Sequence, residues 1–420
     1  MLIIYNTLRL GGIETFYMRL AKTRYLMGKK TKILLTSKAE ASNEQLLYET
    51  KKYADVYFLN DFFKPGFFNK LTLHFLLLKS IDFSELSKVF DDVDQVHVSS
   101  AIYGFLYLNI RNKLKINIPL TVGIYHSKEF TWGEGDKIPY YERCNRVLFT
   151  ALLKSKGVYF FNDGLINLYS QFFDFDKNNV NIFPLGVIDS GATESNNSKL
   201  GDPIRIVSVG RLVNFKAYNL WMVDVVEKLQ NDFNIEYHIF GDGPLAQEIK
   251  RKIEKHKLND KIFLKGNIPY SDFKSTVSQY DIFVGSGTAI VEASSLGIPS
   301  VVGIESLDEP LSYGFLCDIV GFSYNEDGLY EKHDVASLIS NYLYLNENER
   351  HKYKSKHMLW SQKFSMQKCV GNFEQGAITA KPLNISLGGL IFKLRYSLSY
   401  FFFSLYCRVK GKSLSNFVYG

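Results

Sequence analysis

The strongest constraint on the fold is an alternation of short apolar runs with longer segments of helical period. In the first part of the chain, strand-like runs rich in β-branched and aromatic residues occupy residues 2–6, 31–37, 55–60, 95–100, 119–126, 157–162 and 180–184. Their nearly continuous apolar character is typical of parallel strands that are covered on both faces. The intervening segments are long enough for crossover helices. The pattern predicts a Rossmann-like α/β domain over residues 1–190.

The same alternation restarts after a polar interval. Residues 188–202 are mostly small and polar, which favours a linker, placed at residues 191–202. Strand-like runs then follow at residues 204–210, 236–240, 261–264, 281–284 and 300–302. We therefore expect a second Rossmann-like domain over residues 203–360. Two such domains in tandem favour a ligand-binding cleft between them, beyond the carboxyl ends of the strands.

Length and composition agree with two globular domains. A chain of 420 residues exceeds the roughly 250–300 residues at which a single hydrophobic core stops growing. A hydrophobic content of 46% and a charged content of 22% are those of a folded protein. The formal charge of +7 favours anionic partners, such as phosphorylated ligands or anionic lipid. The basic residues are not gathered with aromatic residues in a stripe, which argues against nucleic-acid binding.

The cysteines and the N-terminus indicate a reducing compartment. The four cysteines are far apart and form no C-x-x-C pair, so the sequence suggests neither a disulfide framework nor a zinc site. The apolar start at residues 2–5 is too short for a signal peptide. No run reaches the roughly 20 apolar residues that a membrane span needs. We expect a cytoplasmic protein.

The end of the chain departs from the α/β pattern. Residues 361–376 are expected to form a helix that crosses back to the first domain, and residues 377–420 form a basic, aromatic tail. A helix in this tail would place Lys393 and Arg408 on one face and Phe402 on another. This amphipathic pattern favours a helix in a lipid interface at the membrane. Packing of the helix onto the first domain is the alternative.

Two cations at the start of a helix give the clearest chemical signal. Gly210 ends a strand, and Arg211 and Lys216 follow it. Backbone N–H groups, the helix dipole and both side-chain charges would then converge on one point. A diphosphate fits such a point, because Arg binds phosphate with its fork and Lys binds it as a point charge. The alternative, two solvated surface cations, is less favoured because of the motifs that follow.

Glycine turns follow the next strands. Gly241 and Gly243 form a tight turn that would let the backbone approach a ligand. Further along the chain, Gly287 and Thr288 open a helix that carries Glu292. Strand, glycine loop, helix with a carboxylate, and next strand thus follow in order.

Taken together, these motifs resemble the retaining glycosyltransferases of the GT-B fold, the fourth family, or group one, of the usual sequence classification. The motifs are Gly210-Arg211-Leu212, Lys216, Gly241-Asp242-Gly243-Pro244, Glu292-Ala293 and Gly297-Ile298-Pro299. The first domain agrees more loosely, through Gly11 and Gly12 after the first strand and His126 at the end of another. The resemblance covers about residues 1–375. It implies two Rossmann-like domains that face a cleft and a hexosyltransferase activity.

The resemblance implies a role for each motif. Arg211 and Lys216 would neutralise the donor diphosphate and meet the charge that develops on the leaving nucleotide. Glu292 would accept hydrogen bonds from the ribose hydroxyls. Gly11 and Gly12 would let backbone amides approach the phosphates or the donor sugar. The other donor-binding positions would be Gly210, Gly241, Gly243, Gly287 and Thr288.

The catalytic chemistry implied by the resemblance needs no protein base. In retaining transfer on this fold, the departing phosphate is pictured as taking the acceptor proton on the same face of the sugar. His126 would donate to a sugar hydroxyl or stabilise the transient oxocarbenium, a structural histidine being the alternative. Inversion would require a base from the first domain, and Glu129, Glu134 and Asp136 are the candidates.

One motif departs from the family. The family usually carries two glutamates separated by seven residues, and the first of these positions is occupied by Val284. In the family that carboxylate contacts the donor sugar, so its absence leaves the sugar open. It also favours an alternative, a catalytically silent relative that binds a nucleotide sugar as a partner protein. A sugar-nucleotide epimerase shares the two-domain form, and it would form product without any acceptor.

The expected partners are a nucleotide diphosphate sugar donor and a glycan acceptor. A basic, aromatic tail on a cytoplasmic enzyme fits a lipid-linked acceptor at the inner face of the plasma membrane. Such acceptors occur in capsule, O-antigen and lipopolysaccharide biosynthesis. No metal-ligand cluster stands out in the sequence and the cations make a bound metal unnecessary, so no cofactor is expected.

Overall fold

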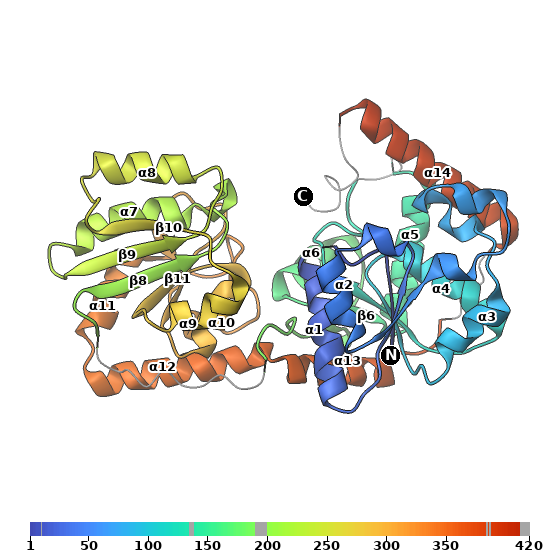
Figure 1. Cartoon of the computed structure of the whole chain (residues 1–420), viewed down its shortest axis with the longest axis horizontal. Coiled ribbons are helices and arrows are strands. Elements are labelled where there is room, and N and C mark those ends of the chain that lie inside the picture. The colour runs from blue at the N-terminus through green and yellow to red at the C-terminus, as the bar shows by residue number, and fades with distance from the viewer. Residues whose placement is uncertain (10, 134–137, 190–199, 384, 386–387, 412–420) are drawn as a thin grey trace. The chain divides into compact units, whose positions relative to one another are not determined.

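The structure is a computed structural model that describes residues 1–9, 11–133, 138–189, 200–383, 385 and 388–411. The chain forms two compact units (Figure 1). Unit 1 comprises Met1–Leu185 and Cys369–Gly420, and unit 2 comprises Gly186–Lys368. The expected linker at residues 191–202 lies largely outside the described residues.

Unit 1 is built on a seven-stranded sheet in the order β3-β2-β1-β4-β5-β6-β7, with every pair parallel. Its strands are β1 (Leu2–Tyr5), β2 (Lys32–Leu35), β3 (Asp55–Phe58), β4 (Val96–Val98), β5 (Leu120–Ile124), β6 (Val158–Phe160) and β7 (Asn181–Ile182). Each strand lies within a run predicted from the sequence. The strands pair in parallel because each connection is a crossover rather than a hairpin.

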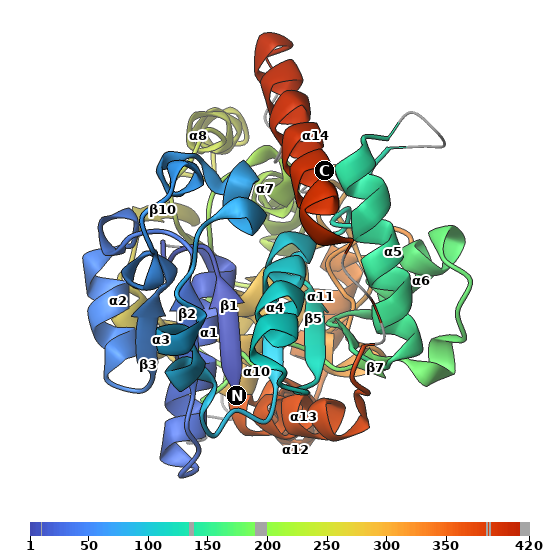
Figure 2. The same cartoon turned by 90° about the vertical axis from the view of Figure 1, so that its right-hand side faces the viewer.

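Helices cover both faces of this sheet. They are α1 (Gly12–Leu26), α2 (Glu44–Lys51), α3 (Phe83–Ser87), α4 (Ala101–Leu114), α5 (Tyr140–Lys154), α6 (Asp163–Phe172), α13 (Met366–Thr379) and α14 (Gly389–Val409). Short 3-10 helices include η4 (Leu73–Leu78). Helices α1 and α2 lie on the face opposite α4 and α5 (Figure 2). The chain returns from unit 2 within α13, whose Phe373 packs on the Phe16 ring of α1.

Unit 2 repeats the architecture with a five-stranded parallel sheet in the order β10-β9-β8-β11-β12. Its strands are β8 (Ile204–Val209), β9 (Ile235–Phe240), β10 (Ile262–Gly266), β11 (Ile282–Gly285) and β12 (Ser300–Val302). A short antiparallel pair, β13 (Leu311–Ser312) and β14 (His333–Asp334), lies outside the sheet. All five predicted strands of this unit are confirmed.

The helices of unit 2 also form two layers. They are α7 (Tyr218–Leu229), α8 (Ala246–Lys255), α9 (Phe273–Val277), α10 (Gly287–Ser295), α11 (Val335–Tyr344) and α12 (Glu347–Ser361), with the short 3-10 helix η8 (Asn214–Lys216) before α7. Helix α7 packs with α8 and α11, and α10 packs with α9 and α12. Strands β11 and β12 are buried along their whole length, as their apolar sequence requires. Strand β9 alternates between buried and partly buried residues, and most of the edge strand β10 is exposed.

Helix α14 packs one face on unit 1, beside α5 and η4 (Figure 2). The Tyr141 and Tyr400 rings lie 4.8 Å apart between centroids, and the Trp132 and Phe403 rings lie 5.1 Å apart. Trp132 belongs to the loop after β5, so α14 lies at the carboxyl edge of the seven-stranded sheet. The opposite face of α14 remains exposed.

A buried polar group anchors α14. The Tyr396 hydroxyl donates to Asn145 Oδ1 at 2.8 Å, and Asn145 Nδ2 donates to Glu142 Oε2 at 2.9 Å. The Glu142 side chain is fully buried, with Arg146 Nε 3.5 Å from its other oxygen. Burial raises the pKa of Glu142 to about 8, against the opposing effects of Asn145 and Arg146. Glu142 is therefore protonated at neutral pH.

This raised pKa predicts a pH-dependent stability. Between the ordinary pKa of 4.5 and about 8 the folded state holds a proton on Glu142 that the unfolded state has lost, so stability falls as the pH rises through this range. Each pKa unit corresponds to about 1.4 kcal/mol. Glu142→Gln, a neutral group of the same shape, should flatten the fall in melting temperature between about pH 5 and about pH 8. The exposed Glu254→Gln should leave it unchanged, and a slope equal in all three proteins would contradict the assignment.

Candidate functional site

The loops that follow β8, β11 and β12 meet at the carboxyl edge of the five-stranded sheet. The ammonium of Lys216, at the end of η8, lies between two glycines: a Cβ atom built on Gly210 would be 3.6 Å from Lys216 Nζ, and one built on Gly287 would be 3.9 Å away. Gly287 has a φ of +66°, which favours glycine there. The fold thus brings Gly210, Lys216 and Gly287, three of the predicted donor-binding positions, together.

Two cations, Arg211 and Lys216, lie at this edge. Arg211 is exposed and Lys216 is partly buried. Neither side chain makes an ion pair or a hydrogen bond with any residue that the structure describes. Burial lowers the pKa of Lys216; the carboxylate of Glu305 opposes this effect, and the neighbouring Arg211 adds to it. Two like charges held near each other at a half-buried position attract an anion.

The N-terminus of α10 points its first N–H groups at the same edge. The N–H of Gly287 is already occupied, because it donates to Asn325 Oδ1 at 2.8 Å, and the Gly287 carbonyl accepts from the Tyr324 hydroxyl at 2.9 Å. The next N–H groups, beginning with that of the exposed Thr288, have no partner within the helix. They add a partial positive charge to that of Lys216.

Two further polar groups complete this edge. The Tyr218 hydroxyl is buried and makes no hydrogen bond with the described residues, and a Cβ atom built on Gly210 would lie 3.8 Å from it. Ser286, which precedes α10, donates through Oγ to Glu305 Oε1 at 2.8 Å. The sequence analysis did not identify Tyr218 or Glu305. Glu305 comes shortly after β12. Its place after the end of a strand, the signal that pointed to Arg211, could have pointed to Glu305 as well.

Gly241 and Gly243 have a packing role in the structure. A Cβ atom on Gly241 would collide with the backbone oxygen of Gly210, and one on Gly243 would collide with that of Leu212. The turn is held to the loop after β8 by the Leu212 N–H, which donates to the Asp242 carbonyl at 2.9 Å. These glycines therefore support the loop that carries Arg211.

Glu292 lies within α10 with 6% of its surface exposed. A carboxylate in such a buried position needs a polar partner, and Glu292 is not without interactions in the structure. Its helix begins at Gly287, so Glu292 belongs to the same element as the candidate anion site.

The remaining predicted residues lie in unit 1, at the carboxyl edge of its sheet. Gly11 and Gly12 begin α1 after β1, and both are exposed. The Glu14 carboxylate lies over Gly11 and accepts from the Tyr5 hydroxyl at 3.1 Å, whereas Gly12 faces open space. Close approach to Gly12 is therefore sterically free.

His126 follows β5. In the sheet, strand β4 lies between β5 and β1, the strand that precedes Gly11 and Gly12. Burial lowers its pKa to about 4, so the imidazole is neutral at neutral pH. Burial raises the pKa of the nearby Glu129 to about 8, so that carboxyl is mostly protonated at neutral pH. Glu134 and Asp136 lie outside the described residues.

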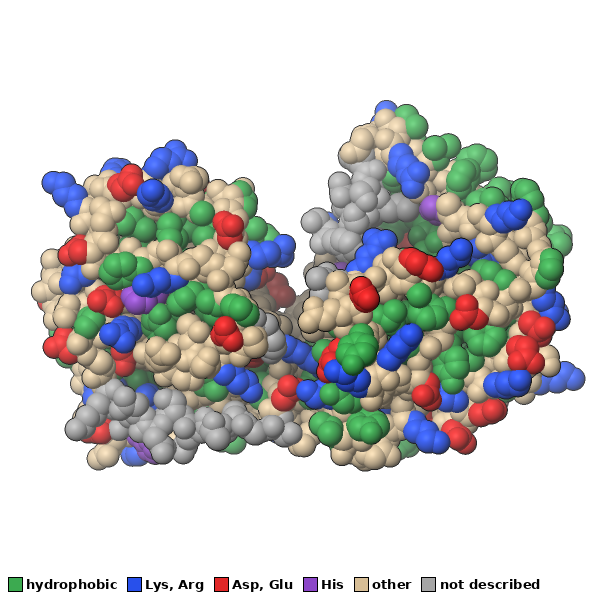
Figure 3. Space-filling model, viewed as in Figure 1, with side chains coloured by type: hydrophobic (Ala, Val, Ile, Leu, Met, Phe, Trp, Pro, Cys, Tyr) green, Lys and Arg blue, Asp and Glu red, His purple; other side chains and the backbone are tan. Residues whose placement is uncertain are grey.

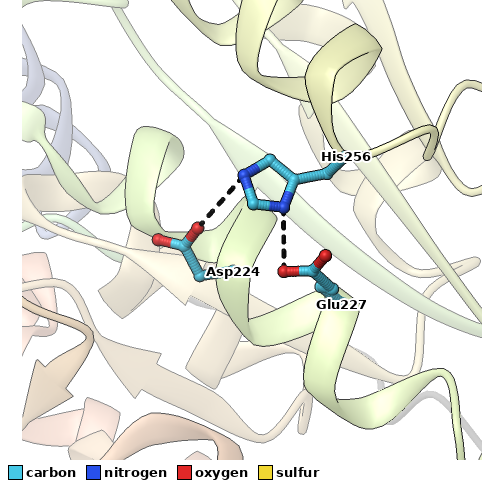
Figure 4. A group of neighbouring side chains, drawn as sticks. All are labelled: Asp224, Glu227 and His256. Atoms are coloured by element: carbon cyan, nitrogen blue, oxygen red, sulfur yellow. Dashed lines mark ion pairs between the residues drawn. The ribbon is translucent and has the colours of Figure 1, made fainter.

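One acid and histidine group lies elsewhere in unit 2 (Figure 4). His256, after α8, contacts Glu227 Oε2 through Nδ1 at 2.8 Å and approaches Asp224 Oδ1 through Nε2 at 3.9 Å. Lys252 Nζ also lies 2.6 Å from Asp224 Oδ2. Among the described residues, Asp224, Glu227 and His256 are the group of acids and histidines whose oxygen and nitrogen atoms lie close enough to one another to hold a metal ion. Its contacts are those of an ion-pair network between α7 and α8.

Comparison with known proteins agrees with this architecture. Residues 192–306 match the family model described as glycosyl transferases group 1. The GPI3 subunit of phosphatidylinositol N-acetylglucosaminyltransferase from Saccharomyces cerevisiae is 29% identical over 115 residues, 26% of this chain and 25% of that protein. The chain thus spans about a quarter of the length of the curated relatives it matches.

Two solved structures share the fold over nearly the whole chain. A glycosyltransferase from Rickettsia africae ESF-5 has a TM-score of 0.60 at 15% identity, covering 90% of this chain and 98% of that one. The pneumococcal O-GlcNAc transferase GtfA, solved in complex with UDP and GlcNAc, has a TM-score of 0.54 at 15% identity, with coverage of 90% and 98%.

The two parallel α/β units therefore define a protein of the GT-B glycosyltransferase fold. Within that class, residues 192–306 match the glycosyl transferases group 1 family, which confirms the resemblance to that group drawn from the motifs of the second domain.

The glycine contacts predict two distinct outcomes on substitution. Gly241→Ala should destabilise the protein by about 2 kcal/mol or more, because the added Cβ collides with backbone and the φ of +147° is unfavourable for alanine. Gly12→Ala meets open space and should leave the melting temperature unchanged. Thermal unfolding of the two variants measures the difference, and equal melting temperatures would contradict the packing role of Gly241.

Proposed function

We propose that this chain is a glycosyltransferase that moves a hexosyl group from a nucleotide diphosphate sugar to a glycan acceptor. The observation that carries the proposal is the pair of neighbouring cations, Arg211 and Lys216, which form no ion pair with the described residues. A diphosphate would supply the anion that pairs with both. It would lie against Gly210, Gly287 and the free N–H groups at the start of α10.

A UDP-linked sugar is the donor that the similar proteins favour. GtfA was solved with UDP and GlcNAc, and the yeast GPI3 subunit belongs to an N-acetylglucosaminyltransferase. In this chain Glu292 would bind the ribose hydroxyls. Arg211 and Lys216 would stabilise the negative charge that develops on the leaving UDP as the glycosidic bond breaks.

Retention is the proposed stereochemical outcome. An inverting enzyme needs a base that is ionised at neutral pH, and of the three candidates Glu129 is mostly protonated there, while Glu134 and Asp136 lie outside the described residues. A front-face reaction instead passes the acceptor proton to the leaving phosphate. The neutral imidazole of His126 would offer a hydrogen bond to the donor sugar without adding charge.

The acceptor is proposed to be lipid-linked, as in bacterial capsule, O-antigen or lipopolysaccharide biosynthesis at the cytoplasmic face of the membrane. The support is the outer face of α14, where large apolar side chains gather with basic ones among them (Figure 3). Its exposed apolar residues are Leu390, Ile391, Leu398, Phe402, Leu405, Tyr406 and Val409. Arg395 and Arg408 add positive charge, the combination found on helices that lie in anionic lipid interfaces.

The position of α14 connects this surface with the acceptor side. The helix lies at the carboxyl edge of unit 1, the same edge as Gly12 and His126. A lipid-anchored acceptor would therefore be presented to that edge from the membrane surface. Among the described residues, no helix has the length and apolarity to cross a membrane.

A catalytically silent nucleotide-sugar-binding protein is the second candidate. The observation that favours it is Val284, a buried apolar residue at the position where the family carries its first glutamate. Hydrolysis or transfer of a bound nucleotide sugar distinguishes the two candidates, because the silent protein would bind the donor without consuming it.

Donor binding gives the first test. Lys216→Ala and Arg211→Ala should each weaken UDP binding by at least about tenfold, since a charged hydrogen bond to phosphate is worth roughly 1.5–3 kcal/mol. Titration calorimetry with UDP measures the dissociation constants. Lys250→Ala, an exposed lysine on α8, is the matched control and should bind UDP normally. Unchanged binding in the Lys216 and Arg211 variants would overturn the proposed site.

Membrane binding gives the second test. Replacing Leu398, Phe402 and Leu405 by Ser should abolish sedimentation with phosphatidylglycerol vesicles, because buried apolar area supplies the binding energy. The three side chains are exposed, so folding should be preserved. Leu359→Ser, on the exposed surface of α12, is the control. Equal sedimentation of all variants would remove the membrane role of α14.

A further inference from the structure

A carboxylate lies beside the candidate diphosphate site, and nothing in the proposed chemistry uses it. Glu305 follows β12 and is partly buried. Its Oε1 accepts a hydrogen bond from Ser286, and it is near enough to Lys216 for each charge to affect the other. The two side chains do not form an ion pair, and Glu305 offsets the positive charge of Lys216 only in part.

The loop that carries Glu305 is fixed by its neighbours. The Glu305 N–H donates to the Asn325 carbonyl at 2.7 Å, and the N–H of Ser306 donates to the Phe215 carbonyl at 2.7 Å. Phe215 belongs to η8 and directly precedes Lys216. The carboxylate is therefore held in a fixed position relative to both the cation and the start of α10.

The hydrogen bond from Ser286 occupies one oxygen of this carboxylate. The other oxygen makes no hydrogen bond with the described residues. Burial raises the pKa of Glu305, whereas Ser286 and Lys216 lower it. A partly desolvated carboxylate with an open oxygen favours a ligand that donates hydrogen bonds, and it repels phosphate.

The order of the strands sets what can lie beside Glu305. Along the carboxyl edge, the turn after β9 comes first, then the cations after β8, then Ser286 after β11, and Glu305 after β12. Glu292, which is assigned to the ribose, lies on α10 between β11 and β12. Glu305 is thus a second carboxylate near the cations, and the sugar is the remaining hydroxyl-bearing group of the donor that it could bind.

We infer that Glu305 binds hydroxyl groups of the transferred sugar and determines which sugar the donor site accepts. This inference rests on the proposed donor site. Glu305 supplies a sugar-binding carboxylate from the loop after β12, although the loop after β11 carries none. Ser286 is the positioning residue that orients it.

The test compares ligands with and without the sugar. Titration calorimetry would measure UDP, UDP-glucose, UDP-galactose and UDP-N-acetylglucosamine on the wild-type protein and on Glu305→Ala and Glu305→Gln. For the UDP-sugar that the wild type binds, we expect Glu305→Ala to weaken binding by about tenfold or more, and Glu305→Gln by less, while UDP binding changes by less than about threefold. Ser286→Ala should give an intermediate loss confined to the UDP-sugar.

The control is Glu326→Ala, since Glu326 is an exposed glutamate near enough to affect Glu305 electrostatically. It should leave all four affinities unchanged. An equal loss of UDP and UDP-sugar in Glu305→Ala would assign the residue to the ribose or to folding and overturn the inference, as would no loss. If the wild type binds neither UDP nor any UDP-sugar, the proposed function itself fails.

Discussion

Parallel pairing of the strands is the constraint on which both units depend, because it brings every loop that follows a strand to one edge of its sheet. In unit 2 this edge collects Lys216, Gly287 and Glu305, which are widely separated in sequence. Hydrogen bonds between loops then fix their spacing, as between Ser306 and Phe215. The chemistry of the edge follows from this alignment rather than from any single motif.

Electrostatics distinguishes the two edges. In unit 2, Lys216 and Arg211 form no ion pair with the described residues, and their desolvation and mutual repulsion carry a cost that an anion would relieve. In unit 1, burial leaves His126 neutral and Glu129 largely protonated at neutral pH. The candidate residues of the two units thus differ in charge: a cationic pair in unit 2, and a neutral histidine with a largely protonated carboxyl in unit 1.

Helix α14 shows why an amphipathic pattern alone does not assign its faces. The sequence predicted an apolar face that includes Phe402, and this side chain is exposed. The buried face includes Tyr396 and Ser397, because a buried hydrogen bond from Tyr396 to Asn145 and the aromatic contacts of Tyr400 hold the helix to α5. The two alternatives weighed from the sequence, packing and a lipid interface, therefore concern opposite faces of one helix.

The sequence by itself determined the strands, their parallel arrangement and the strand-end positions of Arg211 and Lys216, because apolar runs and glycine turns are local signals. Only the tertiary structure decided that Gly241 packs against Gly210 and that Glu305 lies beside Ser286. Both facts depend on contacts between loops far apart in the chain. The sequence also could not predict the shifted pKa values of His126 and Glu129, since both shifts come from burial and burial is set by the packing of the whole unit.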